Sequence, residues 1–448
     1  MIQDMTKGNP FRLILLFTIP VFVGNLFQTF YNLVDSVIVG QFLGVNALAA
    51  VGGTGSLMFL VLGWVNGMTS GFSILIAQSF GAGDDKRLRH CVVMSVYLCA
   101  AMAVVMTGGL LVANESILQV MNTPQEILGD SASYVGVIYA GLAATFAYNM
   151  LAGISRALGD SRTPLYFLVL SSALNILLDL LLVAVLPLGV AGAGYATVIA
   201  QTVSAVLCFC YIRKRYEVLR ITREDRAFSA RSAGQLLGIG IPMALQFSIT
   251  GLGTMVVQAS LNLLGASYIA AVSAVNKIQN IVTQLFPSLG VTLATYVGQN
   301  VGAGNYRRIR QGVRHSLVLE LVFSVAAAVF VYFAGDFFIR LFVQDPTGEI
   351  RGIARQMFHI VAWFYPPLGA IFLFRNALQG LGDGLVPMLG GVFELIARVG
   401  AIVLLAGPFG FTGICFSDPA AWVSALIPLI PVYFFRMRRE ERRTVRIR

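Results

Sequence analysis

Long apolar stretches follow one another along almost the whole chain. The 448 residues are 57% hydrophobic and only 12% charged, whereas soluble domains carry about 25% charged residues. The stretches are longer and more continuously apolar than the alternating strands of a membrane β-barrel. The sequence therefore predicts an all-α polytopic membrane protein with twelve transmembrane helices. The expected spans are residues 11–40, 47–78, 91–113, 131–154, 164–186, 190–212, 236–263, 268–299, 313–334, 353–378, 386–406 and 413–435.

The basic residues gather on one side of these spans. Most of the 31 Lys and Arg residues fall on alternate connections that include both ends of the chain, and the opposite connections hold only Arg340, Arg351 and Arg355. This bias predicts that both termini lie in the cytoplasm. It also explains the net charge of +10 without a nucleic-acid partner. The basic tail, 436–448, is expected to rest on anionic membrane lipids.

The chain contains an internal repeat, in which two related halves follow each other at an offset of about 222 residues. Matching segments occur in the same order in both halves, which indicates duplication. They include Gly81-Ala82-Gly83 with Gly302-Ala303-Gly304, Leu158-Gly159-Asp160 with Leu381-Gly382-Asp383, and Pro20 with Pro242. Six spans per half give both halves the same orientation, so the repeats are parallel. The expected domains are an N-terminal six-helix lobe, 1–215, a cytoplasmic linker, 216–235, a C-terminal six-helix lobe, 236–435, and the tail.

Two acidic residues, Asp35 and Asp179, stand alone in the apolar first half. A charge at the centre of a bilayer costs about 2.5–3.5 kcal/mol even on lenient scales. No Lys or Arg of that half lies at a comparable depth. Two such acids without a base are most simply explained by a bound cation.

Polar side chains share helix faces with these acids. Gly24, Gln28, Tyr31 and Asp35 are spaced by four, three and four residues, and Asn175 lies four residues before Asp179. Thr197 lies on a similar polar face of the sixth span. Hard oxygen ligands that converge from several helices suit a small cation. The sequence predicts a cation-coupling site of Asp35, Asn175, Asp179 and Thr197, and the alternative is that Asn175 and Thr197 only tie helices together by hydrogen bonds.

The doubled layout, the paired Gly-Ala-Gly turns and the segment Arg156-Ala157-Leu158-Gly159-Asp160-Ser161-Arg162-Thr163-Pro164 resemble the multidrug and toxic compound extrusion (MATE) family, prokaryotic branch. The resemblance implies a V-shaped pair of six-helix lobes and export of drugs or metabolites in exchange for H⁺ or Na⁺. The four residues of the predicted site match the acid-and-amide cation site in the N-terminal lobe of prokaryotic members.

The second half carries a different set of charges at membrane depth: Lys277, Glu394, Arg398 and Asp418. Glu394 and Arg398 are four residues apart and are expected to pair along one helix. Two acids and two bases can neutralise one another. The sequence therefore predicts a charge-compensated network in the second half and an uncompensated anionic site in the first.

Substrate contacts are expected from polar and aromatic side chains on spans near the lobe interface. Aromatic walls suit flat organic cations. The candidates are Gln28, Tyr31, Asn32, Trp64, Asn149, Gln246, Gln279, Gln284 and Phe286. For any one of them, a helix-packing role is the alternative.

These features predict a secondary active antiporter, not an enzyme, that exports cationic, drug-like organic compounds by alternating access. It is expected to act as a monomer in the plasma (inner) membrane, with no cofactor and no metal beyond a possible Na⁺ at the acid site. Two alternatives stay open: a flippase for a lipid-linked precursor from the same wider superfamily, and a membrane scaffold without transport. A flippase needs a strongly cationic cavity, for which only Lys277 and Arg398 are available, and a scaffold does not explain the two membrane acids.

Overall fold

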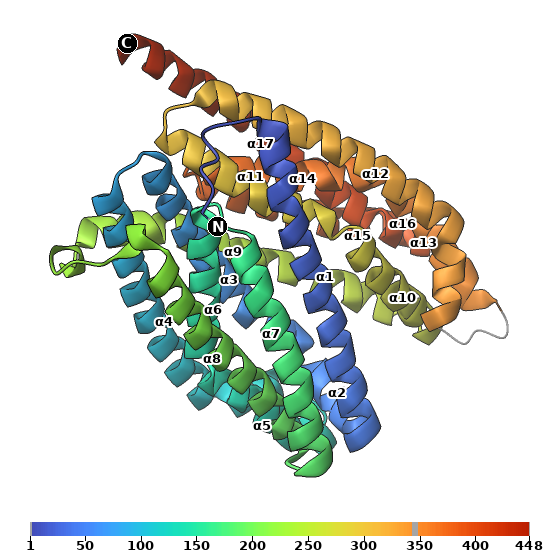
Figure 1. The fold of residues 1–448 in the computed structure, drawn as a ribbon. Helices are drawn as coiled ribbons and strands as arrows, with labels where there is room; N and C mark the ends of the chain where they lie inside the picture. The colour runs from blue at the N-terminus through green and yellow to red at the C-terminus, as the bar shows by residue number, and fades with distance from the viewer. Residues whose placement is uncertain (1, 343–347, 448) are drawn as a thin grey trace. The chain divides into compact units, whose positions relative to one another are not determined.

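A computed structural model describes residues 2–342 and 348–447, which are almost entirely helical and contain no β-strand (Figure 1). Ten of their helices are long and apolar enough to cross a membrane, or up to twelve spans if each of two bent pairs counts as one. The twelve-helix expectation for this all-α membrane protein is thereby confirmed.

The first half contains α1 (Pro10–Leu43), α2 (Val45–Gly53), α3 (Gly55–Gly81), α4 (Asp85–Val120), α5 (Gln125–Ala140), α6 (Leu142–Ala157), α7 (Arg162–Asp179), η1 (Leu180–Val185) and α8 (Gly189–Arg215). The second half contains α9 (Ala230–Asn262), α10 (Ala266–Val282), α11 (Leu285–Gly302), α12 (Tyr306–Phe342), α13 (Glu349–Val361), η4 (Ala362–Phe364), α14 (Tyr365–Gly380), α15 (Leu385–Phe409), α16 (Phe411–Cys415) and α17 (Ser417–Ile447).

The chain forms two compact units. Unit 1 comprises the residues up to Asp4 and Ile19–Ala244, and unit 2 comprises Met5–Thr18 and the residues from Leu245 onward. Two helices, α1 and α9, are divided between the units, each close to its internal proline, Pro20 or Pro242. The predicted basic tail continues α17 as helix to Ile447, and Arg448 lies outside the described residues.

The repeated turns have the same backbone geometry in both units. Gly83 and Gly304 end their Gly-Ala-Gly turns with φ of 68° each, and Gly159 and Gly382 have φ of 81° and 86°. A glycine in this left-handed region is the usual way to end a helix, because it has no Cβ to clash. The amide after the first turn, Asp84 N, donates to Ser79 O at 3.2 Å, and its counterpart Asn305 N donates to Asn300 O at 2.8 Å. The duplication in sequence is thus also a duplication of local structure.

The connection between α8 and α9 is a short folded segment with two 3₁₀ turns, η2 (Glu217–Leu219) and η3 (Glu224–Arg226). Asp225 is buried in it and its Oδ2 accepts hydrogen bonds from Thr222 N at 2.8 Å and from Arg89 Nε on α4 at 2.9 Å. Burial alone would raise the pKa of Asp225, but these hydrogen bonds outweigh it and hold the pKa below its usual range. The segment is therefore anchored to α4 as part of unit 1.

Within unit 1, α3 and the first part of α9 cross at glycines. A Cβ on Gly71 would lie 2.6 Å from the Cα of Gly240, and a Cβ on Gly67 would lie 2.5 Å from the Cα of Ala244. Both contacts are to backbone, which cannot rotate away. Small residues that let helix backbones approach closely are typical of packing in membranes.

We expect Gly71→Leu to force these two helices apart. The cost should be at least the ~1–3 kcal/mol typical of an overpacked core, and it should appear as a lower melting temperature of the purified protein. Gly108→Leu is a matched control, because a Cβ at Gly108 on α4 meets no atom within 4 Å. Equal melting temperatures for the two variants would contradict the close crossing.

Candidate cation-binding site

Three helices of unit 1 carry the four residues selected from the sequence. Asp35 lies on α1, Asn175 and Asp179 lie on α7, and Thr197 lies on α8. Asp179 is fully buried and Asn175 is 2% exposed, whereas Asp35 and Thr197 are half-buried. α1 approaches α7 at Gly24, where a Cβ would lie 3.3 Å from a methyl group of Leu168. The structure thus brings all four residues into one cluster.

The Asn175 amide links α7 to α8. In the orientation that its neighbours favour, its NH₂ group donates to Asp179 Oδ2 at 3.1 Å and its oxygen accepts from Thr197 Oγ1 at 3.3 Å. Thr197 Oγ1 also lies 3.1 Å from the carbonyl oxygen of Ala193, one turn earlier. Asn175 and Thr197 therefore tie the helices together and also hold the Asp179 carboxyl group in place.

The Asp35 and Asp179 carboxyl groups lie close enough to each other to interact directly. Two ionised carboxylates are acceptors only and repel each other, so a proton or another cation stabilises such a pair. Apart from this mutual contact, the Oδ1 atoms of both residues are buried and have no donor. Among the described residues, no Lys or Arg forms an ion pair with either acid. The pair is an anionic centre whose charge depends on a bound cation or proton.

Two phenol rings complete the surroundings of the acid pair. Tyr31 on α1 and Tyr134 on α5 are both close enough to interact electrostatically with Asp35 and Asp179. The sequence predicts Tyr31 on the same helix face as Asp35 and as a substrate contact, but it does not single out Tyr134. The spacing of Tyr134 three residues after Ser131 could have indicated a polar face on α5. A neutral phenol can donate a hydrogen bond to a carboxylate without neutralising its charge.

The backbone changes its geometry at Asp179. α7 ends there, and the next six residues, Leu180–Val185, form a π-helix. Such wider turns are rare and occur frequently at functional sites. Gly192 on α8 faces this segment, because a Cβ there would lie 3.0 Å from the carbonyl oxygen of Leu182. The π-helix thus begins directly after the buried Asp179, and Gly192 lets α8 approach it.

The residues expected to contact substrate differ in their exposure to solvent. Gln28 and Asn32 on α1 are exposed, while Trp64, Asn149, Gln279 and Gln284 are half-buried. Gln246 is buried and its Oε1 accepts from Gln379 Nε2 at 3.2 Å, within unit 2. Phe286 is 1% exposed and packs edge-on against Phe323, with ring centroids 5.6 Å apart. The surroundings of Gln246 and Phe286 are those of helix-packing residues rather than of a surface open to substrate.

The buried charges of unit 2 are compensated, but the expected partners were wrong. Glu394 on α15 pairs with Arg375 on α14, and Arg398 Nε donates to Asp418 Oδ1 on α17 at 3.0 Å. A pair along one helix, Glu394 with Arg398, does not form. The reason is that Arg375, which lies near the end of an expected span (353–378), is only 7% exposed and lies beside Glu394. Lys277 is exposed and does not take part.

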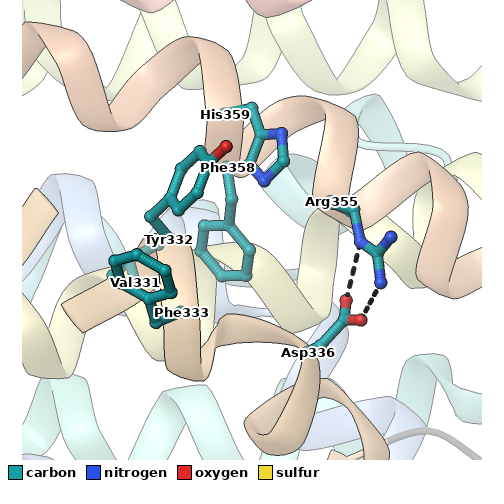
Figure 2. Close-up of a pocket in the computed structure, with 7 residues that line it drawn as sticks. All are labelled: Val331, Tyr332, Phe333, Asp336, Arg355, Phe358 and His359. Carbon is teal, nitrogen blue, oxygen red and sulfur yellow. Dashed lines mark hydrogen bonds and ion pairs between the residues drawn. The ribbon is translucent and has the colours of Figure 1, made fainter. Parts of the chain in front are cut away.

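Unit 2 also contains a pocket of about 260 Å³ between α12 and α13, shown in Figure 2. Its lining residues are Val331, Tyr332, Phe333, Asp336, Arg355, Phe358 and His359. Tyr332 stacks on His359 with ring centroids 4.4 Å apart, and Arg355 Nε donates to Asp336 Oδ1 at 3.3 Å. Because its acid and base neutralise each other, this pocket lacks the uncompensated charge of the site in unit 1.

Known proteins resemble the chain over most of its length. The MatE family profile matches twice, at residues 20–181 and 242–404, which agrees with the duplication. The "Probable multidrug resistance protein YoeA" of Bacillus subtilis (strain 168) is 26% identical over 98% of this chain and 96% of its own. The "Probable multidrug resistance protein YpnP" of the same strain is 26% identical over 85% of this chain and 84% of its own.

Solved structures show the same fold. A crystal structure of MATE in complex with MaL6 superposes with a TM-score of 0.92 at 23% identity, covering 98% of this chain and 99% of that one. An outward-facing MATE family transporter of the MOP superfamily superposes with a TM-score of 0.91 at 22% identity, covering 98% of each chain. The double profile match extends over well more than half of the sequence. The chain therefore belongs to the MATE family of multidrug transporters and is a multi-pass membrane transporter rather than an enzyme.

Proposed function

We propose that the protein exports small organic cations across the plasma membrane in exchange for H⁺, with coupling at Asp35, Asn175, Asp179 and Thr197. The observation that carries the proposal is the close Asp35–Asp179 pair, which no Lys or Arg of the described residues neutralises. In this proposal both termini lie in the cytoplasm and the protein acts as a monomer.

The charge of the acid pair supplies the coupling. With one shared proton the pair carries one negative charge. Packing the surrounding helices so tightly that water leaves this charge is costly in free energy. A second proton removes that charge, so the helices around it can pack without water. An organic cation bound nearby compensates the same charge. The second proton or the organic cation can each compensate the single negative charge of the pair, but both together would leave an excess positive charge. Entry of the proton therefore favours release of the organic cation, and the two are exchanged.

Sodium is the alternative coupling ion. The oxygens of Asp35, Asn175, Asp179 and Thr197 are hard ligands of the kind that alkali and alkaline-earth cations take. Two adjacent carboxyl groups without a base can, however, share a single proton, which satisfies both acceptors with the smallest cation. We therefore assign the coupling to H⁺ and treat Na⁺ as a distinct outcome of the test.

We expect purified protein in vesicles to move a fluorescent organic cation against its gradient when a proton gradient is imposed at zero membrane potential. A sodium gradient at equal pH on both sides should not drive this movement. Transport under the sodium gradient alone would overturn the assignment to H⁺. Absence of movement under both gradients would overturn the antiport itself.

A further inference from the structure

One face of α10 is polar and exposed, although the helix belongs to an apolar span. Ser273, Asn276, Lys277 and Asn280 are all exposed and are spaced by three, one and three residues, which places them on one side of the helix. The opposite side is buried and apolar, with Ala271, Val275 and Ile278 among its residues. That side packs against α12 and α13 within unit 2. The polar face is thus the one that unit 2 leaves uncovered.

This face lies deep in the span. α10 and α11 cross the apolar region as one bent span with a break of 41°. Lys277 follows the first residue of α10, Ala266, by a distance of about 16 Å at the helical rise per residue, roughly half of a bilayer core. An ammonium and two amides at that depth are too costly to face lipid tails. They must meet water, as side chains that line a transport path do.

Lys277 differs from the other deep cations of unit 2. Arg375 and Arg398 are buried and paired with Glu394 and Asp418. Among the described residues, no carboxylate lies within ion-pair distance of Lys277, and no other hydrogen bond occupies it. Its ammonium has three donors, and the amides of Asn276 and Asn280 add more beside it. The face is rich in donors and carries one uncompensated positive charge.

We infer that Lys277, with Asn276 and Asn280, binds the carboxylate of a zwitterionic organic substrate. The Lys277 ammonium repels a purely cationic substrate, whereas a carboxylate accepts a charge-assisted hydrogen bond from the ammonium and further ones from the amides. The inference rests on the proposed export of organic cations and narrows it to compounds that also carry an acid group. Lys277 is on this account a residue that determines specificity.

The test uses two dyes that differ by one methyl group. Tetramethylrhodamine has a free carboxylate and is a zwitterion, and its methyl ester is a cation of nearly the same shape. Binding is measured by fluorescence polarisation to the full-length protein in phosphatidylcholine nanodiscs, with empty discs subtracted. We expect Lys277→Gln to weaken binding of the acid about tenfold, a loss of about 1.4 kcal/mol, and to leave binding of the ester unchanged or stronger. Lys277→Arg should restore most of the affinity for the acid, and Lys214→Gln, an exposed lysine at the end of α8, should change neither dye.

Two results would overturn the inference. One is a Lys277→Gln variant that binds both dyes as the wild type does or weakens both equally. The other is loss of Lys277-dependent acid binding when phosphatidylglycerol is added to the discs, which would assign Lys277 to a lipid headgroup. Neither result touches the antiport, because the ester's proton-driven movement in vesicles tests that separately. If the methyl ester is transported under a proton gradient while Lys277→Gln binds the acid dye as the wild type does, the antiport stands and this inference fails.

Discussion

Asp179→Asn is expected to abolish proton-driven efflux, by at least about a hundredfold, while the protein keeps its fold. Asparagine has nearly the same shape as aspartic acid, and its NH₂ group can donate to Asp35 as a protonated carboxyl group would. The variant therefore fixes the singly protonated form of the pair, and residue 179 can no longer accept or release a proton during the exchange. Since the pair already lacks a basic partner, removing one buried acid should leave the melting temperature equal or higher.

Efflux of dye from vesicles and the melting temperature would be measured for Asp179→Asn and for Asp35→Asn. Asp130→Asn, which removes an exposed acid on α5, is the matched control and should behave as the wild type in both assays. A variant that melts far below the wild type would indicate that Asp179 serves the fold, and its lost efflux would then say nothing about coupling.

Arg375→Ala is expected to lower the melting temperature, in contrast to Asp179→Asn, which should lower efflux and leave the melting temperature equal or higher. Glu394 is 4% exposed, and without Arg375 it would be a buried acid with no base. Breaking a buried pair by removing one partner costs about 3–5 kcal/mol, so the melting temperature should fall markedly. The double variant Arg375→Met/Glu394→Gln should recover most of the loss, because it removes both charges and keeps the volume.

The matched comparison for this pair is Arg310→Ala, which removes the more exposed partner of an ion pair between Arg310 and Glu441. Exposed pairs contribute about 0–1 kcal/mol, so its melting temperature should hardly change. If Arg375→Ala were thermally silent but inactive in transport, the charge pairs of unit 2 would belong to the coupling machinery.

The fold was largely predictable because it depends on patterns that the sequence shows directly. Apolar length gave the spans, and the duplication gave two equivalent sets of six. The glycines of the repeated turns, Gly83 and Gly304, have the left-handed φ that helix-ending turns need. The sequence did not show that α1 and α9 would be divided between the compact units, because that depends on packing between distant segments.

The cluster around Asp179 was predictable for the same reason: residues three or four apart share a helix face, and lone membrane acids are conspicuous. Partners on other helices were harder. Tyr134 looks like any aromatic residue of a span until the tertiary structure brings it within electrostatic reach of Asp35 and Asp179. Arg375 lies near the end of a span, where a base is expected at the membrane surface, and only the tertiary structure shows that it turns inward to Glu394. The π-helix after Asp179 has no sequence signal that we can identify.

The most direct test of the central claim is dye efflux from vesicles that contain the Asp35→Asn/Asp179→Asn double variant, compared with wild type under the same proton gradient. A site that couples transport through these two carboxyl groups predicts gradient-driven efflux from wild-type vesicles and none from the double variant, at equal protein content and equal melting temperature. Efflux from the double variant at the wild-type rate would contradict the account and place the coupling cation elsewhere, with the buried Glu320 of α12 the next acid to test.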